Sequence, residues 1–388
     1  MKKHLFRLAI FLFLASSIAA PSAFAAKTQQ KAIIAYVFVK DRIIAPDEVA
    51  AASLTRVNYA FANITDGKIV QGFAHDRENF QVLNNLKKIN PHLEVLVSVG
   101  GWTWSSPFSD VSLTAKSRKI FIESVVQFLR DNKLDGLDID WEYPNSVGNG
   151  NIHRPEDTQN YTKLLKELRD RFNKEEKVSG HHWITSIAVG ASADFIANTE
   201  MRKVQRYVDS VNLMSYDYYE SGSDPTTGHH APLYTNPSDP KHVSADASVS
   251  LFEHAGVPAR KLVLGVPFYG RAWADVSETN HGLFQPGKKA DVWANYNNIA
   301  GTLLNQGYVR YWDAASSSPY LYNPTTRTFI SYEDPESIRL KCQYVLKHRL
   351  GGVMFWDYSG DASDHALLNA INQGLASGSP TDAKKMGN

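Results

Sequence analysis

Three carboxylic acids alternate with apolar residues along one short stretch of the chain. Asp138, Asp140 and Glu142 enclose Ile139 and Trp141. Successive side chains of a β-strand point to opposite faces, so a strand would place the three acids on one face, at a spacing of roughly 6–7 Å. Like charges that are buried together raise one another's pKa, and general acid catalysis needs a carboxyl group that stays protonated near neutral pH. The pattern therefore predicts catalysis rather than solvated charges on an edge strand.

The position of each acid suggests its role. Glu142 lies nearest the end of the predicted strand and has an aromatic residue on either side, which favours a protonated carboxyl group. We expect Glu142 to be the proton donor. Asp138 and Asp140 can share one proton, which leaves Asp140 able to turn toward developing positive charge. Asp135 falls on the opposite parity, so we expect it to be structural.

Runs of β-branched and aromatic residues recur along the chain, with helical patterns between them. The predicted strands are residues 32–39, 55–62, 93–98, 134–141, 183–190, 208–215, 261–268 and 351–357. Apolar residues repeat at helical spacing over 122–129 and 161–172, and Asp334 followed by Pro335 marks a helix start. This alternation predicts an α/β fold, a (β/α)8 TIM barrel, whose active sites lie at the C-terminal ends of the strands.

One stretch breaks the alternation. Residues 272–334 are rich in Gly, Asn, Ser and Tyr, with short strand-like pieces at 308–312 and 328–332 and no long helical stripe. They predict a small α+β insertion between the seventh strand and its helix. Such an insertion would form one wall of a cleft at the C-terminal face of the barrel.

The two ends of the chain are expected to lie outside the catalytic domain. Residues 1–25 resemble a secretory signal peptide, with two lysines, an apolar run over 5–14 and a small-residue stretch ending at Ala25. Residues 376–388 are small and polar and are expected to form a flexible tail. The catalytic domain would be residues 26–375, exported to the periplasm or the extracellular space and without a membrane span.

The composition excludes several classes of partner. The 388 residues contain 41 Lys and Arg against 40 Asp and Glu, without the basic excess that binding to nucleic acid or to an anionic membrane requires. Cys342 is the only cysteine, which excludes a disulfide framework, and it falls on a helical pattern typical of the core. We expect a monomer whose partner is a small substrate.

Two pairs of adjacent histidines invite a metal-site interpretation, which we reject. Residues 181–182 and 229–230 are His-His pairs, and neither has the further ligands that a zinc site requires. No metal and no cofactor are expected. Residues 227–234 are predicted to form a surface loop near the cleft.

Several motifs in the right order give the chain a family resemblance. The acids fit the signature DxxDxDxE, and further matches lie on other predicted strands: Ser98 to Trp102, Met214 to Asp217, Tyr269 to Arg271, and Trp356. In these motifs, which span nearly the whole chain after residue 25, the protein resembles the family-18 glycoside hydrolases, the chitinases.

The resemblance implies a retaining, substrate-assisted mechanism, which departs from the two-carboxylate scheme. Glu142 would protonate the leaving oxygen, and the substrate's own 2-acetamido group would attack the anomeric carbon to form an oxazolinium ion. Asp140 would orient the acetamido group, Asp138 would hold Asp140, and Tyr216 would donate to the acetamido oxygen. The substrate implied is a β-1,4-linked N-acetylglucosamine chain, cut internally, as in chitin.

The same resemblance and the strand parity suggest the residues that bind the sugar chain. Trp356 would form the floor beneath the distorted sugar, and Trp102 would stack the next sugar after a Gly-Gly turn that lets the ligand approach the backbone. The predicted binding set is Tyr36, Phe61, Gly100, Gly101, Trp102, Thr103, Tyr143, Met214, Asp217, Arg271 and Trp356. Within it Tyr36 and Phe61 would close the pocket.

Three questions stay open on the sequence alone. Asp217 and Arg271 either contact the sugar or only pair with each other. Trp104, Phe108 and Trp273 either stack on sugars or pack in the core. The alternatives to a chitinase are an endo-β-N-acetylglucosaminidase acting on glycans or peptidoglycan, a chitin-binding lectin, and a metal-dependent barrel enzyme.

Overall fold

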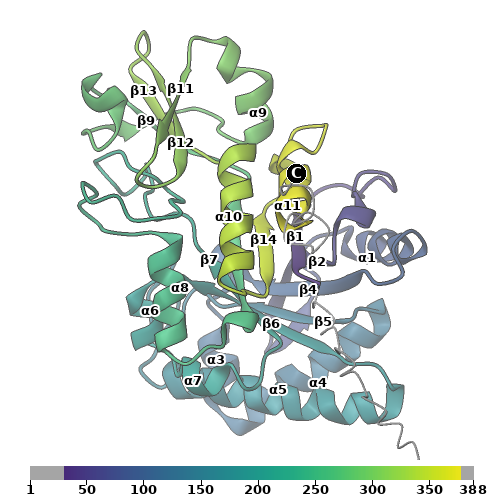
Figure 1. The fold of residues 1–388 in the computed structure, drawn as a ribbon. Helices are drawn as coiled ribbons and strands as arrows, with labels where there is room; N and C mark the ends of the chain where they lie inside the picture. Colours follow the sequence, from purple (N-terminus) through teal and green to yellow (C-terminus); the bar gives the residue numbers. More distant parts are fainter. Residues whose placement is uncertain (1–29, 377–388) are drawn as a thin grey trace, which may run out of the picture. The chain divides into compact units, whose positions relative to one another are not determined.

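A computed structural model describes residues 30–376, so the predicted signal peptide and, apart from Ala376, the predicted tail lie outside the described residues. Within this range eight parallel strands close into a barrel (Figure 1). They are β1 (Ala32–Phe38), β2 (Arg56–Thr65), β4 (Glu94–Gly100), β5 (Gly136–Asp140), β6 (Ile184–Gly190), β7 (Ser210–Met214), β8 (Leu262–Pro267) and β14 (Gly352–Trp356). The predicted TIM barrel is confirmed.

The barrel closes through its first strand. Ile34 of β1 is in register with Met354 on one side and with Arg56 on the other. A short strand, β3 (Lys68–Val70), folds back on β2 as an antiparallel hairpin and extends the sheet at that point.

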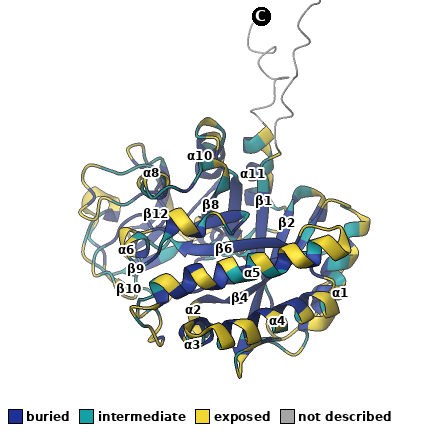
Figure 2. Ribbon diagram, turned by 90° about the horizontal axis from the view of Figure 1, so that it is seen from below, coloured by how far each residue is buried: buried dark blue, intermediate teal, exposed yellow. Residues whose placement is uncertain are grey.

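Helices cover the outside of the barrel, and the longest of them turn an apolar face to the strands. Figure 2 shows the longest two, α4 (Ala115–Asn132) and α5 (Asp157–Ser179), buried along one side and exposed along the other. Thr114 caps α4, and Asp334 caps α10 (Pro335–Lys347) by accepting hydrogen bonds from two backbone amides, as the sequence predicts. Among the described residues no helix is long and apolar enough to cross a bilayer.

The remaining helices are shorter or lie nearer the ends of strands. They are α1 (Asp76–Asn85), α2 (Gly101–Trp104), α3 (Phe108–Leu113), α6 (Ala193–Ala197), α7 (Met201–Val204), α8 (Ala245–His254), α9 (Tyr296–Gly301) and α11 (Ala366–Ala376). Cys342 lies on α10 against α11, fully buried, with its Sγ 3.7 Å from the Ile371 carbonyl, so the prediction of a core cysteine is confirmed.

The predicted insertion between β8 and α10 is an antiparallel sheet with one short helix, α9. Its strands are β9 (Arg271–Ala274), β10 (Lys288–Lys289), β11 (Val309–Asp313), β12 (Ser318–Asn323) and β13 (Thr328–Ser331), in the order β10-β9-β13-β12-β11. Figure 1 shows these strands next to the start of α10. Sequence patterning indicated β11 and β13 but missed β12, a central strand whose residues are all buried.

Candidate active site

The predicted acidic face points into the barrel. Ser98 of β4 and Ser186 of β6 flank Asp138 in the sheet register. Leu137 and Ile139 belong instead to the core between strands and helices. The exposed fractions of the three acids are 0% for Asp138, 4% for Asp140 and 8% for Glu142. Three carboxyl groups are therefore buried in sequence along and just beyond the C-terminal end of β5.

Asp138 is held by four donors from the surrounding strands. Its Oδ2 accepts hydrogen bonds from the Tyr36 hydroxyl at 2.9 Å and the Ser98 hydroxyl at 2.8 Å. Its Oδ1 accepts from the Ser186 hydroxyl at 2.5 Å and from Asn212 Nδ2 at 3.3 Å. Burial raises the pKa of Asp138, and the hydrogen bonds from the two serines and the tyrosine oppose that rise. Asp138 is thus locked in place, and its carboxylate has more hydrogen-bond donors than that of Asp140.

Asp140 has the opposite environment. Its Oδ1 is buried and has no hydrogen-bond partner among the described residues. Burial raises the pKa of Asp140 well above its usual value, and the nearby charges of Glu142 and Asp138 raise it further. A neutral Asp140 beside an anionic Asp138 is the arrangement that these environments favour, because two adjacent charges in a buried site repel each other.

The pKa of the Glu142 carboxyl group lies near neutral pH. Burial raises the pKa of Glu142 to about 7; a hydrogen bond with Tyr143 opposes the rise, and the charges of Asp217 and Glu220 add to it. A carboxyl group with a pKa near neutrality can both donate and accept a proton under mild conditions, which is what a general acid that later acts as a base requires.

A polar network stands beside the acids and ties the barrel to the insertion. Asp217 accepts a hydrogen bond from the Tyr269 hydroxyl at 2.7 Å and another from Arg271 Nε at 2.7 Å. Arg271 also reaches Glu220 at 2.8 Å. Burial acts to raise the pKa of Asp217, but His230 and Arg271 outweigh it and hold that pKa well below the usual range. Asp217 and Arg271 therefore pair with each other, and a contact from either to a sugar stays a prediction.

Aromatic rings gather at the ends of β1, β2 and β14. The half-buried Trp356 ring stacks on Phe61, with ring centres 5.4 Å apart and planes at 20°, and lies 5.9 Å from the Tyr36 ring. Met214 and Tyr216 pack into the same cluster inside the barrel. Phe61 is buried against the indole of Trp356. The Tyr36 hydroxyl donates its hydrogen bond to Asp138, so both side chains support other residues of the site.

The two glycines at the end of β4 leave room for neighbouring parts of the protein, and an approach of the ligand to this backbone stays a prediction. A Cβ on Gly101 would lie 2.7 Å from the Phe61 ring, and one on Gly100 would lie 2.3 Å from the Asp140 carbonyl oxygen. Both glycines have positive φ, 105° for Gly100 and 73° for Gly101. The missing side chains let β4 approach β5 and the aromatic cluster.

Burial distinguishes aromatic residues that pack in the core from those that solvent can reach. Trp102 is 49% exposed, and its neighbour Thr103 is also exposed. Phe108 is buried and stacks on Trp141, with ring centres 5.3 Å apart. Trp273 is buried too and donates to the Asp224 carbonyl at 3.0 Å. Phe108 and Trp273 are therefore packing residues.

Trp104 and Tyr143 are only partly buried. Trp104 lies against Phe73, with ring centres 5.1 Å apart. Tyr143 lies against Phe195 at 6.2 Å. Burial raises the pKa of Tyr143, and the charge of Glu142 raises it further, so its hydroxyl keeps its proton.

The prediction that residues 227–234 form a surface loop is wrong. Thr227, His229 and His230 are buried, with exposed fractions of 0%, 3% and 0%. His229 Nε2 lies 3.1 Å from Asp313 Oδ2 in β11, and the His230 amide donates to Ser331 Oγ in β13 at 2.8 Å. The insertion covers this loop, and a polar sequence does not reveal a cover supplied by a distant segment. Among residues 30–376 no cluster of three potential metal ligands occurs.

Comparison with known proteins assigns this geometry to a family. A family model described as Glycosyl hydrolases family 18 matches residues 26–361. Chitinase A1 of Niallia circulans is 41% identical over 334 residues, which cover 81% of this chain and 48% of that protein. The chain belongs to glycosyl hydrolase family 18. The chain spans about half the length of Chitinase A1.

Solved structures of family-18 proteins have the same fold. A family-18 N-acetylglucosaminidase from Paenibacillus barengoltzii is 40% identical in sequence. Its structure superposes with a TM-score of 0.81, and the match covers 89% of this chain and 100% of that one. A chitinase from Bacillus thuringiensis is 34% identical, with a TM-score of 0.85 over 90% of this chain and 70% of that one.

Two residues that the sequence analysis missed hold the backbone of the family-18 acid motif. The Ser105 hydroxyl donates to the Asp140 carbonyl at 3.0 Å and accepts from the Glu142 amide at 2.9 Å. Asn151 Nδ2 donates to the Glu142 carbonyl at 2.6 Å. Both come from loops outside the motif, and we find no local sequence signal that would have indicated them.

Asp135 directly precedes β5, at the opposite end of this strand from Glu142. Its Oδ2 accepts a hydrogen bond from the Val95 amide at 2.7 Å and pairs with Lys87 at 2.6 Å. Its carboxylate thus joins neighbouring strands at the bottom of the barrel, away from the family-18 acids.

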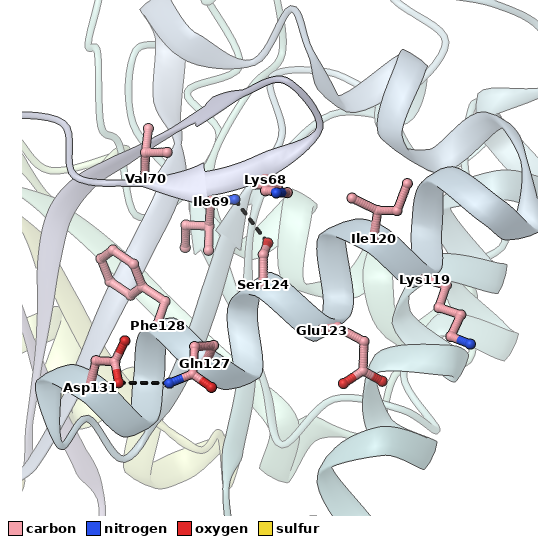
Figure 3. Close-up of a pocket in the computed structure, with 10 residues that line it drawn as sticks. All are labelled: Lys68, Ile69, Val70, Lys119, Ile120, Glu123, Ser124, Gln127, Phe128 and Asp131. Atoms are coloured by element: carbon pink, nitrogen blue, oxygen red, sulfur yellow. Dashed lines mark hydrogen bonds between the residues drawn. The ribbon is translucent and has the colours of Figure 1, made fainter.

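A separate cavity of about 610 Å³ lies on the outside of the barrel (Figure 3). It is lined by residues of β3 and α4, including Ile69, whose amide donates to Ser124 Oγ at 3.1 Å. The family-18 motif residues do not line it. This cavity therefore contains none of the predicted site residues.

Proposed function

We propose that this family-18 protein is a chitinase that cuts β-1,4-linked N-acetylglucosamine chains internally, by a retaining, substrate-assisted mechanism. The observation that carries the proposal is the contrast between the two aspartates behind Glu142. Asp138 is held by four donors, whereas the buried Asp140 Oδ1 has no partner among the described residues. An unpartnered buried acceptor is costly, so Asp140 is suited to receive a donor from the substrate.

In the first step Glu142 acts as the general acid, and Asp140 acts as the hydrogen-bond acceptor for the acetamido group. Glu142 gives its proton to the leaving glycosidic oxygen as the bond to the anomeric carbon breaks. The acetamido carbonyl oxygen of the same sugar attacks that carbon and forms a cyclic oxazolinium ion. Asp140 passes its proton to Asp138, which gives up one of its four donors, and the resulting Asp140 carboxylate accepts the acetamido N–H and stabilises the positive ion. The proton returns to Asp140 when water opens the ion.

The second step restores the enzyme. Glu142, now ionised, takes a proton from water, and the oxygen of that water attacks the anomeric carbon from the face that the leaving group vacated. The ring opens to the N-acetyl sugar with its original configuration. A Glu142 pKa of about 7 suits both proton transfers, since the same group must lose and regain a proton.

Turnover of N-acetylglucosamine hexamer by the wild-type protein and by Glu142→Gln tests the assignment of the acid. We expect a loss of at least about 10²-fold, at the low end of what general acid catalysis contributes. Glu167→Gln on the surface of α5 is the matched control, because it makes the same chemical change away from the site. Near wild-type turnover by Glu142→Gln would reject the assignment.

Two further measurements test the substrate-assisted route. Glucosamine hexamer, which lacks the acetyl groups, should not be cut. The first products from the N-acetyl hexamer should have the β configuration. Cleavage of the deacetylated chain, or α products, would exclude participation of the acetamido group.

A second candidate is release of single N-acetylglucosamine units. It is favoured by the likeness to a family-18 N-acetylglucosaminidase, which this chain matches over all of that protein's length. Early products from the hexamer distinguish the two: dimers to tetramers indicate internal cutting, and monomer with pentamer indicates removal of end units.

We also propose that the protein acts outside the cytoplasm. The support is the lysine-led apolar run at residues 1–25. Recovery of the protein from the culture medium or periplasm, with an N-terminus at Ala26, tests this.

A further inference from the structure

His230 is a buried titratable side chain that the mechanism above does not use. Its side chain is fully buried, and among the described residues neither ring nitrogen has a hydrogen-bond partner. Nδ1 lies 3.6 Å from Asp217 Oδ1. That distance is too long for a formed hydrogen bond, but catalytic contacts in unliganded enzymes often shorten when substrate binds.

The surroundings hold the ring where it is. The His230 amide donates to Ser331 Oγ at 2.8 Å, and its carbonyl accepts from the Tyr218 amide at 3.0 Å. The next carbonyl, that of Ala231, accepts from Lys341 Nζ at 2.6 Å. The imidazole packs against the Tyr269 ring, with ring centres 5.3 Å apart. Four separate segments therefore hold His230 and Ala231 beside Asp217.

The Lys341 anchor is itself buried. Lys341 forms an ion pair with Glu333, and both side chains are 1% exposed. Glu333 also accepts from Ser337 Oγ at 2.8 Å. A buried pair that is fully satisfied in this way resists movement, since separating it would leave an unpaired charge in the interior.

Burial favours a neutral His230 ring, and the nearest acceptor favours a proton on Nδ1. Burial lowers the pKa of His230; Asp217 opposes this, and Arg271 and Lys341 add to it. A neutral imidazole has one N–H, and its neighbouring acceptor is the Asp217 carboxylate, on the Nδ1 side. The ring is therefore placed to donate to Asp217.

We propose that His230 is a positioning residue, which holds the Asp217 carboxylate in the orientation from which its charge acts on Glu142. His230 works through Asp217 and does not touch substrate. The inference rests on the proposed role of Glu142 as the general acid. It assigns a task to His230, which belongs neither to the acid motif nor to the predicted sugar-binding set.

Two amide variants of His230 test the geometry. In His230→Asn the side-chain amide occupies the place of Nδ1 and keeps a donor toward Asp217. In His230→Gln the amide reaches the place of Nε2 and leaves the Nδ1 side without a donor. The proposal predicts that His230→Asn keeps at least half of the wild-type kcat, whereas His230→Gln loses fivefold or more in kcat with KM changed less than twofold. Equal kcat values for the two variants would overturn it.

A second measurement asks whether the effect passes through Asp217. His230→Gln is combined with Asp217→Asn, and kcat for N-acetylglucosamine hexamer is compared with that of Asp217→Asn alone. The proposal predicts a further loss below twofold. A repeated fivefold loss in this background would show that His230 acts on folding or on another group, and would overturn the proposal.

Two controls separate this question from the others. His229→Asn, in the adjacent buried histidine that pairs with Asp313 of the insertion, should lower the melting temperature without a change in kcat. The comparison with Glu142→Gln tests the general acid independently. If Glu142→Gln stays active the proposed function fails, whereas equal His230 variants with an inactive Glu142→Gln reject only the role of His230.

Discussion

Replacing Glu142 should make the protein more stable at neutral and alkaline pH, but not at pH 4. In the folded protein burial raises the pKa of Glu142 from 4.5 to about 7. Between these two pH values the folded state keeps a proton that the unfolded chain releases. Wild-type stability therefore falls as the pH rises from 4.5 to 7, and the loss is complete above pH 7.

The size of the effect follows from the pKa. A rise from 4.5 to about 7 corresponds to roughly 3 kcal/mol, at about 1.4 kcal/mol for each tenfold change in proton affinity. The side-chain amide introduced by Glu142→Gln is neutral at every pH and has nearly the shape of a protonated glutamate. The variant should thus match the wild type at pH 4 and gain about 3 kcal/mol at pH 8. In a protein of this size that is about 4–6 °C in melting temperature.

Urea unfolding at pH 4 and pH 8, followed by tryptophan fluorescence, measures the difference directly. The control is Asp170→Asn, whose carboxylate forms an ion pair with Lys166 in which both side chains are 53% exposed. Its effect should stay below about 1 kcal/mol at both pH values, as for other exposed pairs. A gain at pH 8 of less than about 1 kcal/mol in Glu142→Gln, or an equal gain at pH 4, would refute a Glu142 pKa raised by burial.

Three other changes have defined outcomes. Asp217→Asn removes a negative charge that raises the Glu142 pKa, so the alkaline limb of the kcat/KM profile should move to lower pH; an unmoved or raised limb would contradict this. Asp140→Asn should lower kcat by about 10²-fold or more with little loss of stability, because it replaces an unpartnered carboxyl group; activity within about tenfold of wild type would rule out its role. Gly100→Ala should cost about 3 kcal/mol in urea unfolding, because φ is 105° and the new Cβ would lie 2.3 Å from the Asp140 carbonyl oxygen; a loss below about 1 kcal/mol would mean that the turn relaxes freely.

The barrel and the acidic face could be predicted from the sequence because both are periodic. Strands buried on both faces appear as continuous apolar runs, and helices with one buried face repeat every three or four residues. The same parity rule places Asp138 and Asp140 inward and Ile139 outward, whatever the rest of the fold does. These are local properties of the chain, so the residues themselves carry the information.

The environment that makes the acids different from one another depends on tertiary structure. The four donors on Asp138 come from β1, β4, β6 and β7, and the Glu142 backbone is held by Ser105 and Asn151 from two further loops. Burial by these segments raises each pKa by an amount that no local pattern encodes.

The loop around His229 and His230 shows the same limit. Its polar sequence indicates a surface loop, but a sheet formed largely by residues far along the chain covers it, as the contact from His229 to Asp313, 84 positions later, demonstrates. The sequence by itself therefore determined which elements form and which acids share a face. Only the tertiary structure decided which polar groups lose their water, because that loss depends on segments that meet only after folding.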